Sequence, residues 1–186
     1  VHDRLACSPE EYVRRYDAIQ AAMAANGLDA LLVRGPENIT YLSGYETPGY
    51  YKYHCVIVPK DGEPVFVVRD FEWINTPEFA WSTRIAKVFD WDHPPSVTAN
   101  VLRQLGLGSG KRIGVEKQGF FYTVDEHETI CAELADNSIV DATSIVWDAR
   151  MIKSAEEIGI MRTSAHLVDL AMRAGWDATR PGASGD

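Results

Sequence analysis

The chain has 186 residues, of which 46% are hydrophobic and 24% are charged, and its formal net charge is −9 at pH 7. This length suits one domain with an appendage, and the composition is that of a globular protein with a buried core. The acidic balance argues against a nucleic-acid-binding surface, which needs clustered Lys and Arg. No apolar run approaches the roughly 18 residues that suggest a membrane span.

The N-terminal residues and the cysteines indicate the cellular compartment of the protein. Residues 1–7 lack the basic start and the long apolar stretch of a signal peptide. The three cysteines, Cys7, Cys55 and Cys131, are odd in number and widely spaced, so they indicate neither a disulfide framework nor a zinc motif. We therefore expect a cytoplasmic protein.

The first predicted helix follows directly from its start and stop signals. Ser8 and Glu11 have the spacing of a capping box, and Asn26-Gly27 is a typical helix end. Its buried face is expected to hold Tyr12, Tyr16, Ile19 and Met23. The continuous apolar run Leu28–Val33 comes next and is typical of a strand covered on both faces.

The remaining elements alternate in the same way. We expect a helix over 36–44, strands over 53–59, 64–68 and 84–89, a helix over 96–105, a strand over 112–116, a helix over 122–134 and a strand over 138–141. The Asp61-Gly62 pair favours the tight turn of an antiparallel hairpin. The predicted fold is α/β, with three layers: a mixed sheet of about six strands between helices.

The last helix has the most clearly specified start. Ser154 and Glu157 have the spacing of a capping box. Its apolar stripe is expected to hold Ile158, Met161, Ala165, Val168 and Met172, and the helix to run to about Gly175. Because little chain follows on which this stripe could pack, we expect a second domain to begin here. The expected domains are residues 1–149 and residues 150–186.

One segment invites a functional interpretation that its chemistry does not favour. The glycine-rich loop Gly106–Lys111 has Leu105 where a phosphate-binding loop needs glycine and Arg112 where it needs a hydroxyl. It also leads into a strand, so no helix N-terminus would face an anion. We interpret it as a turn. No Gly-x-Ser-x-Gly elbow is present, which leaves a dispersed Ser-His-Asp or Cys-His arrangement open.

Two acidic clusters are candidate metal sites. Asp90, Asp92 and His93 offer ligands for a divalent ion, and Asp125–Glu128 could add more. Successive helical residues diverge by about 100°, however, so the second group cannot all face one ion. We expect both clusters to be solvated residues at the protein surface. A self-sufficient metal enzyme using Asp90, Asp92 and His93 is the alternative, which calorimetry with Mn²⁺, Co²⁺ or Zn²⁺ would test.

The segment Gly44–His54, which we name the tyrosine loop, is the strongest candidate for binding. It carries four tyrosines, a lysine and a histidine between glycine and proline residues. Aromatic rings with polar tips provide contact area at little entropic cost. The alternative is that these rings merely cover the sheet. The candidate substrate-loop residues are Tyr45, Tyr50, Tyr51, Lys52 and His54.

Several segments together resemble the N-terminal half of the creatinase/aminopeptidase P/prolidase family of pita-bread metallohydrolases. They are Gly27–Val33, Glu37–Tyr45 and Arg150–Arg162, the last of which resembles the junction between the two domains of that family. Arg112–Glu116 and Val140–Ala142 sit where the family places later strands. The resemblance covers essentially the whole chain.

The resemblance implies a ribonuclease-H-like α/β domain that precedes a catalytic domain. In the family the catalytic domain supplies two aspartates, a histidine and two glutamates, which usually hold two divalent metals such as Mn, Co or Zn. Creatinase-type members work without metal. That constellation would lie beyond Asp186, so no catalytic residue, metal ligand or cofactor is assigned to this chain.

The resemblance also implies a role for the tyrosine loop. In creatinase-like relatives the corresponding segment reaches across a dimer and helps to close the partner's active site, and Tyr50 and Lys52 align with an aromatic and a basic residue there. We therefore expect the non-catalytic domain of a homodimeric hydrolase of X-Pro peptides or a related small C–N substrate. The alternative is a stand-alone peptide-binding or protein-binding module without catalysis, and the gene sequence beyond Asp186 would discriminate.

Overall fold

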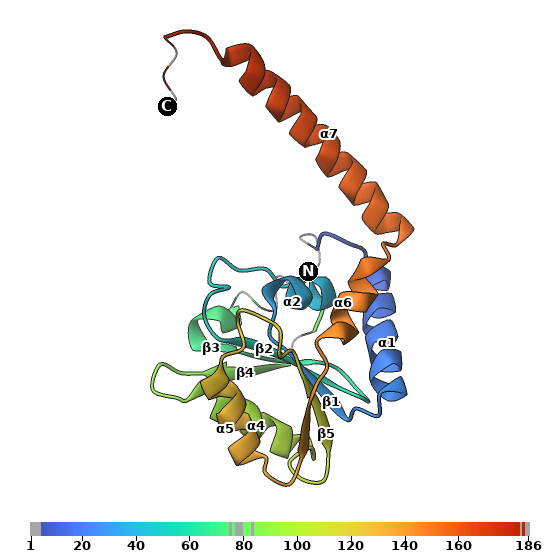
Figure 1. Ribbon diagram of the computed structural model, residues 1–186, viewed down its shortest axis with the longest axis vertical. Coiled ribbons are helices and arrows are strands. Elements are labelled where there is room, and N and C mark those ends of the chain that lie inside the picture. Colours follow the sequence, from blue (N-terminus) through green and yellow to red (C-terminus); the bar gives the residue numbers. More distant parts are fainter. Residues whose placement is uncertain (1–4, 75, 77–79, 83, 183, 185–186) are drawn as a thin grey trace. The chain divides into compact units, whose positions relative to one another are not determined.

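The computed structural model describes residues 5–74, 76, 80–82, 84–182 and 184. The chain divides into two compact units, Val1–Met151 and Ile152–Asp186. The division falls two residues after the boundary expected from the sequence, because a helix completes the first unit. The first unit is an α/β domain with a central sheet between two layers of helices (Figure 1).

The central sheet is mixed and has six strands, as predicted. The strands are β1 (Ala30–Val33), β2 (His54–Pro59), β3 (Val65–Arg69), β4 (Ile85–Val88), β5 (Arg112–Val115) and β6 (Ser138–Asp141). Their order is β4-β3-β2-β1-β5-β6. Only β2 runs against its neighbours, and the predicted hairpin joins it to β3. Gly62 has a φ of 97° in that turn, a conformation that favours glycine.

Helices cover both faces of the sheet (Figure 1). One layer holds α1 (Pro9–Ala25), α2 (Pro36–Ser43) and α6 (Ser144–Met151), and the other holds α4 (Pro94–Gln104) and α5 (Val124–Glu133). The alternation of side chains along β1 divides the core, since Leu31 and Val33 face the first layer while Ala30 and Leu32 face the second. All four are buried, as the continuous apolar run predicted.

Helix α6 was not predicted, since the sequence analysis assigned no element between the strand over 138–141 and the last helix. It forms because Ile145 and Val146 are buried on the first helical layer. The Tyr41 hydroxyl on α2 also donates a 3.2 Å hydrogen bond to the carbonyl of Ala149. The helix therefore completes the core of the first unit. The burial of its apolar side chains stabilises it, although its sequence carries only a weak helix signal.

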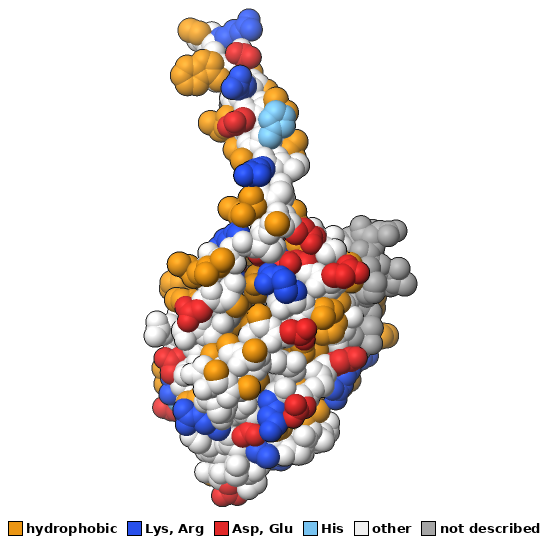
Figure 2. Space-filling view, turned by 90° about the vertical axis from the view of Figure 1, so that its right-hand side faces the viewer, with side chains coloured by type: hydrophobic (Ala, Val, Ile, Leu, Met, Phe, Trp, Pro, Cys, Tyr) orange, Lys and Arg blue, Asp and Glu red, His pale blue; other side chains and the backbone are white. Residues whose placement is uncertain are grey.

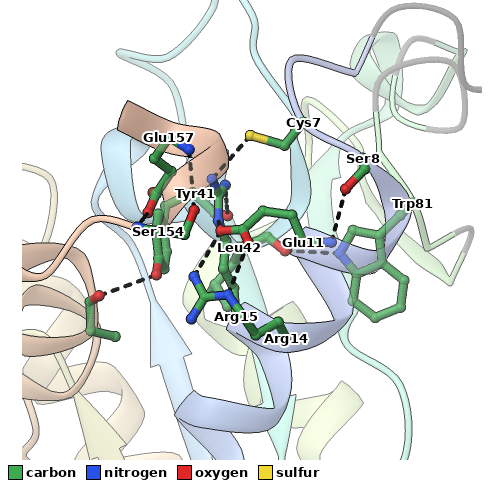
Figure 3. Close-up of polar contacts among 11 residues, drawn as sticks. Cys7, Ser8, Glu11, Arg14, Arg15, Tyr41, Leu42, Trp81, Ser154 and Glu157 are labelled. Atoms are coloured by element: carbon green, nitrogen blue, oxygen red, sulfur yellow. Dashed lines mark hydrogen bonds and ion pairs between the residues drawn. The ribbon is translucent and has the colours of Figure 1, made fainter. Parts of the chain in front are cut away.

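The start of α1 has one of the two hydrogen bonds of the expected capping box. Ser8 Oγ accepts a 3.2 Å hydrogen bond from the N–H of Glu11, whose carboxylate instead binds Arg14 and Arg15 at 2.7–2.9 Å (Figure 3). Arg15 also donates to the carbonyl of Tyr41 at 2.9 Å. Glu11 therefore belongs to an ion-pair network that connects α1 to α2. The predicted buried face of α1, with Tyr12, Tyr16, Ile19 and Met23, is confirmed.

The second unit consists mainly of α7 (Ala155–Ala178), which runs three residues beyond the expected end. Its predicted capping box is confirmed: Ser154 Oγ accepts from the N–H of Glu157, and the Glu157 carboxylate accepts from the N–H of Ser154. None of its residues is buried. Among the helices that the structure describes, none is long and apolar enough to cross a bilayer.

Candidate functional site

The candidate site lies at one edge of the sheet. Five of the six strands run in the same direction, so their carboxyl ends and the start of β2 share this edge. Crevices beyond the carboxyl ends of strands are common ligand sites in α/β proteins. A cavity of about 460 Å³ opens here. Its walls come from α2, the tyrosine loop, β2 and the segment after β5, and are lined by Pro36, Glu37, Ile39, Thr40, Tyr45, Glu46, Thr47, Tyr50, His54 and Phe121.

A buried carboxylate lies behind the cavity wall. Glu72 belongs to the 3₁₀ helix η1 (Asp70–Ile74), which follows β3, and is 8% exposed. Its Oε2 accepts a hydrogen bond of 2.7 Å from the Tyr45 hydroxyl and one of 3.0 Å from the Thr47 hydroxyl. A Cβ on Gly49 would lie 2.7 Å from Oε1 of the same carboxylate, so the loop backbone passes close to Glu72. The tyrosine loop is therefore fixed to η1.

His54 is a buried residue that lines the cavity. The side chain is 5% exposed overall, and its Nδ1 lies 3.1 Å from the Lys52 carbonyl oxygen. Because a carbonyl only accepts, Nδ1 carries the proton and Nε2 keeps a lone pair when the ring is neutral. Burial lowers the pKa of His54, which favours the neutral ring at pH 7. Nε2 lies 3.5 Å from the Tyr45 hydroxyl.

Arg34, just after β1, joins three segments around the site. Its guanidinium donates to the carbonyl of His54 and, at 2.7 Å, to the carbonyl of Phe121. It also forms a 2.8 Å ion pair with Glu126 and stacks 3.9 Å from the centroid of the Tyr53 ring. Planar guanidinium groups suit such a combination of stacking and forked hydrogen bonds. Arg34 therefore fixes the relative positions of β2 and the segment after β5.

A second buried acid, Glu116, holds the start of α2. Its carboxylate accepts from the N–H groups of Arg34 and Gly35 at 2.6 and 2.7 Å, and from Asn38 Nδ2 at 2.5 Å. Burial raises the pKa of Glu116, and these donors oppose the rise. Arg150 extends the network by donating to Asn38 Oδ1 at 2.6 Å. Glu116 thus positions the helix that forms one wall of the cavity.

The structure separates the five candidate residues of the tyrosine loop. Tyr45, Tyr50 and His54 line the cavity, whereas Tyr51 and Lys52 do not. Tyr51 is 65% exposed, and its ring contacts the Tyr50 ring at 6.0 Å between centroids. Lys52 Nζ lies 5.3 Å from the centroid of Tyr51. The loop thus has a buried base and an exposed tip, and a binding role for these residues remains a prediction.

Sequence reasoning missed several residues around the cavity. The most important is Glu72, which is 27 positions from its partner Tyr45. Phe121, which packs edge-on against Tyr50 at 6.0 Å, lies still further from the loop in sequence. An acidic residue within the otherwise apolar run 71–74 was the available signal for Glu72. Nothing local linked Phe121 to the tyrosine loop.

Neither acidic cluster converges on a metal position. Asp90 pairs with Arg69 at 2.6 Å, Asp92 accepts from the N–H of Phe89, and His93 contacts Ser96. Across the described part of the chain, no three His, Cys, Asp or Glu side chains are grouped so as to hold an ion. No chemical step is therefore assigned to a metal held by these residues.

The glycine-rich loop is a turn before β5, as its sequence predicted. Gly110 donates its N–H to the carbonyl of Asp136, and Lys111 donates its N–H to Asn137 Oδ1. These backbone donors are therefore used within the protein. On the face shown in Figure 2, Lys and Arg side chains are interspersed with acidic ones and form no continuous basic stripe.

Comparison with known proteins identifies a family and several relatives. Residues 15–152 match the family described as creatinase/prolidase N-terminal domain. The chain is 28% identical to the ectoine hydrolase of Halomonas elongata over 168 residues, which cover 86% of this chain and 42% of that protein. It is also 28% identical to the creatinase of a Bacillus species over 177 residues, which cover 94% of this chain and 42% of the relative. The chain thus spans less than half the length of these two relatives.

Solved structures share the fold. The prolidase from Thermococcus sibiricus superposes with a TM-score of 0.77 at 20% sequence identity, over 93% of this chain and 46% of that one. Identity this low supports the fold alone. The α/β architecture expected from the sequence is therefore confirmed both by the arrangement of the strands and by this likeness.

Proposed function

The chain belongs to the family of creatinase/prolidase N-terminal domains, and from that premise we propose that it is the non-catalytic N-terminal domain of a homodimeric hydrolase. The proposed substrates are X-Pro peptides or related small molecules with a C–N bond to be cleaved. We place the catalytic residues, and any pair of Mn, Co or Zn ions, in a second domain that follows residues 1–149.

The construction of the tyrosine loop carries this proposal. Tyr45 and His54 fix its two ends in the buried wall of the cavity, while Tyr50 and Tyr51 are 54% and 65% exposed at its tip. A rigid base with exposed aromatic residues suits a loop that contacts a ligand or a neighbouring subunit. The proposed work of the domain is therefore dimerisation and closure of the substrate pocket in the partner subunit.

Within the loop, we assign different roles to the tip and the base. Tyr50 and Tyr51 would provide apolar contact area, and Lys52 would pair with a substrate carboxylate as a charge-assisted donor. Tyr45 and His54 would hold the loop in position. No residue of this chain is assigned a proton transfer or a nucleophilic step.

Steady-state kinetics of the full-length enzyme test the role of Lys52. Lys52→Ala should lower kcat/KM by about tenfold, mainly through KM, because an ion pair to the substrate is lost in the ground state and the transition state alike. Lys60→Ala is the matched control, since Lys60 is an exposed lysine at the other end of β2. Equal kcat/KM values for both variants and the parent would remove Lys52 from the mechanism.

A mixed dimer tests whether the loop serves the partner subunit. A Lys52→Ala chain is co-expressed with a chain inactivated in its catalytic domain. If the loop acts across the interface, the mixed dimer contains one active site with an intact loop and recovers parental KM at that site. A KM that stays at the Lys52→Ala value would show that the loop acts within its own subunit.

A further inference from the structure

Three carboxylates line the cavity or lie directly behind its wall. Glu37 and Glu46 are exposed where they line it, and Glu72 is buried behind Tyr45. Within the described residues, none of the ion pairs involves these three acids, and the lining contains neither Lys nor Arg. The start of α2 adds roughly half a positive charge, which the single charge of Glu37 offsets. The lining residues therefore carry a net negative formal charge.

Aromatic rings form much of the rest of the wall. Tyr45, Tyr50 and Phe121 line the cavity, and the rings of Tyr50 and Phe121 meet edge to face at 6.0 Å. The face of an aromatic ring is electrically negative, so it attracts a cation that lies over it. Aromatic and carboxylate groups thus favour the same sign of charge in a ligand.

The imidazole of His54 adds a hydrogen-bond acceptor. Its Nδ1 proton is directed to the Lys52 carbonyl, which leaves a lone pair on Nε2. The contact of Nε2 with the Tyr45 hydroxyl is long, at 3.5 Å, and that hydroxyl donates its proton to Glu72 at 2.7 Å. A buried hydrogen-bond acceptor whose donor is this distant lowers the stability of the protein. The N–H group of a ligand in the cavity would be a better donor to Nε2.

We propose that this cavity binds a small organic cation that carries N–H groups, such as a primary ammonium, an amidinium or a guanidinium. The carboxylates of Glu37 and Glu46 accept charge-assisted hydrogen bonds at its mouth. Tyr50 and Phe121 cover the charged group, and His54 Nε2 accepts from it. A volume of about 460 Å³ suits a small ligand. The inference goes beyond the proposed function, which assigns no ligand to this cavity.

Calorimetry with ligands of one shape and different charge tests the ligand class. The probes are benzamidinium, benzamide and benzoate, which share a ring and differ in charge, with phenyltrimethylammonium as a cation that lacks N–H groups. Benzamidinium should bind about tenfold more tightly than benzamide or phenyltrimethylammonium, through its charge-assisted bonds, and benzoate more weakly than benzamide. Equal affinity for benzamidinium and benzamide would overturn the proposal.

Substitution of Glu37 and Glu46 tests whether the cation binds in this cavity. The double variant Glu37→Gln and Glu46→Gln keeps size and hydrogen bonding but removes two charges, and should weaken benzamidinium by about tenfold or more while leaving benzamide unchanged. Glu128→Gln is the control, because Glu128 is an exposed acid on α5 that does not line the cavity. An equal loss in the control and the double variant would place the effect in the overall charge of the protein and end the inference.

The two proposals can fail separately. Lys52 does not line the cavity, so Lys52→Ala tests the loop tip without touching the cation site. Parental kcat/KM in Lys52→Ala together with charge-selective binding would reject the proposed loop mechanism and keep the cation site. Lowered kcat/KM together with equal binding of benzamidinium and benzamide would reject the cation site alone.

Discussion

The hydroxyl of Tyr45 donates a 2.7 Å hydrogen bond to the carboxylate of Glu72, 27 positions further along the chain. Both side chains are buried, at 2% and 8% exposure. This bond fixes the start of the tyrosine loop to the 3₁₀ helix after β3, and so positions one wall of the cavity.

Removing that hydroxyl should destabilise the protein. Tyr45→Phe keeps the packing of the ring but leaves Glu72 with only the Thr47 hydroxyl as donor to the same oxygen. We expect the free energy of unfolding to fall by about 1–3 kcal/mol, the cost of an unsatisfied buried group. Urea denaturation followed by circular dichroism measures it. Tyr51→Phe, at an exposed position, should change stability by less than about 0.5 kcal/mol.

Gly114 occupies a position in β5 that has no room for a side chain. A Cβ there would lie 2.7 Å from the Cβ of Ala142 and 2.9 Å from a methyl group of Leu28. We expect Gly114→Ala to cost about 1–3 kcal/mol through overpacking. Gly119→Ala is the comparison, since its nearest neighbour would be 3.9 Å away. Similar thermal midpoints for the two variants would contradict this description of the core.

Acid should weaken the ion-pair network at the start of α1. Hydrogen bonding to Arg14, and then to Arg15, lowers the pKa of Glu11 to about 2 from its ordinary value of 4.5. A lowered carboxyl pKa contributes stability above pH 4.5, and this contribution is lost as the pH falls from 4.5 towards 2. The difference in unfolding free energy between the parent and Glu11→Gln should therefore shrink over that interval. A difference that is constant with pH would show that Glu11 contributes by packing alone.

His54 should titrate below an ordinary histidine. Burial lowers its pKa from 6.5, as do Arg34 and Arg69, whereas Glu72 and the bond to the Lys52 carbonyl oppose the shift. The unfolded chain then binds a proton more readily, so stability falls as the pH decreases below about 6.5. NMR titration of the folded chain measures the pKa, with the histidines of the urea-unfolded chain as reference. A folded value at or above that reference would contradict the neutral ring proposed for the cavity.

The first unit should fold without α7. Among the described residues, the two core clusters contain none beyond Ala149, so a chain ending at Met151 keeps this core. We expect its thermal midpoint to change by only about 3 °C. A chain ending at Thr143 also loses Ile145 and Val146, which are buried, and should no longer unfold cooperatively. Light scattering of the Met151 chain and the full chain further tests whether the apolar stripe of α7 drives association.

Much of the fold could be predicted because its signals are local. The hydrophobic pattern identified the six strands, and the Asp61-Gly62 pair identified the hairpin. Gly44, with a φ of 77°, ends α2 where the sequence placed a stop. Errors arose where a residue had competing partners. Glu11 turns to two arginines instead of completing a capping box, and α6 forms because its apolar side chains are covered by other elements.

The sequence by itself determined most of the secondary structure, the α/β class and the family likeness, because hydrophobic periodicity, turn residues and capping residues act over a few positions. The tertiary structure alone decided the cavity. It divided the tyrosine loop into a buried base and an exposed tip, and it brought Glu72 and Phe121 to the wall. It also let Arg34 reach Glu126, 92 positions away. These contacts depend on the order of the strands, since side chains distant in sequence meet only where the sheet brings their loops to one edge.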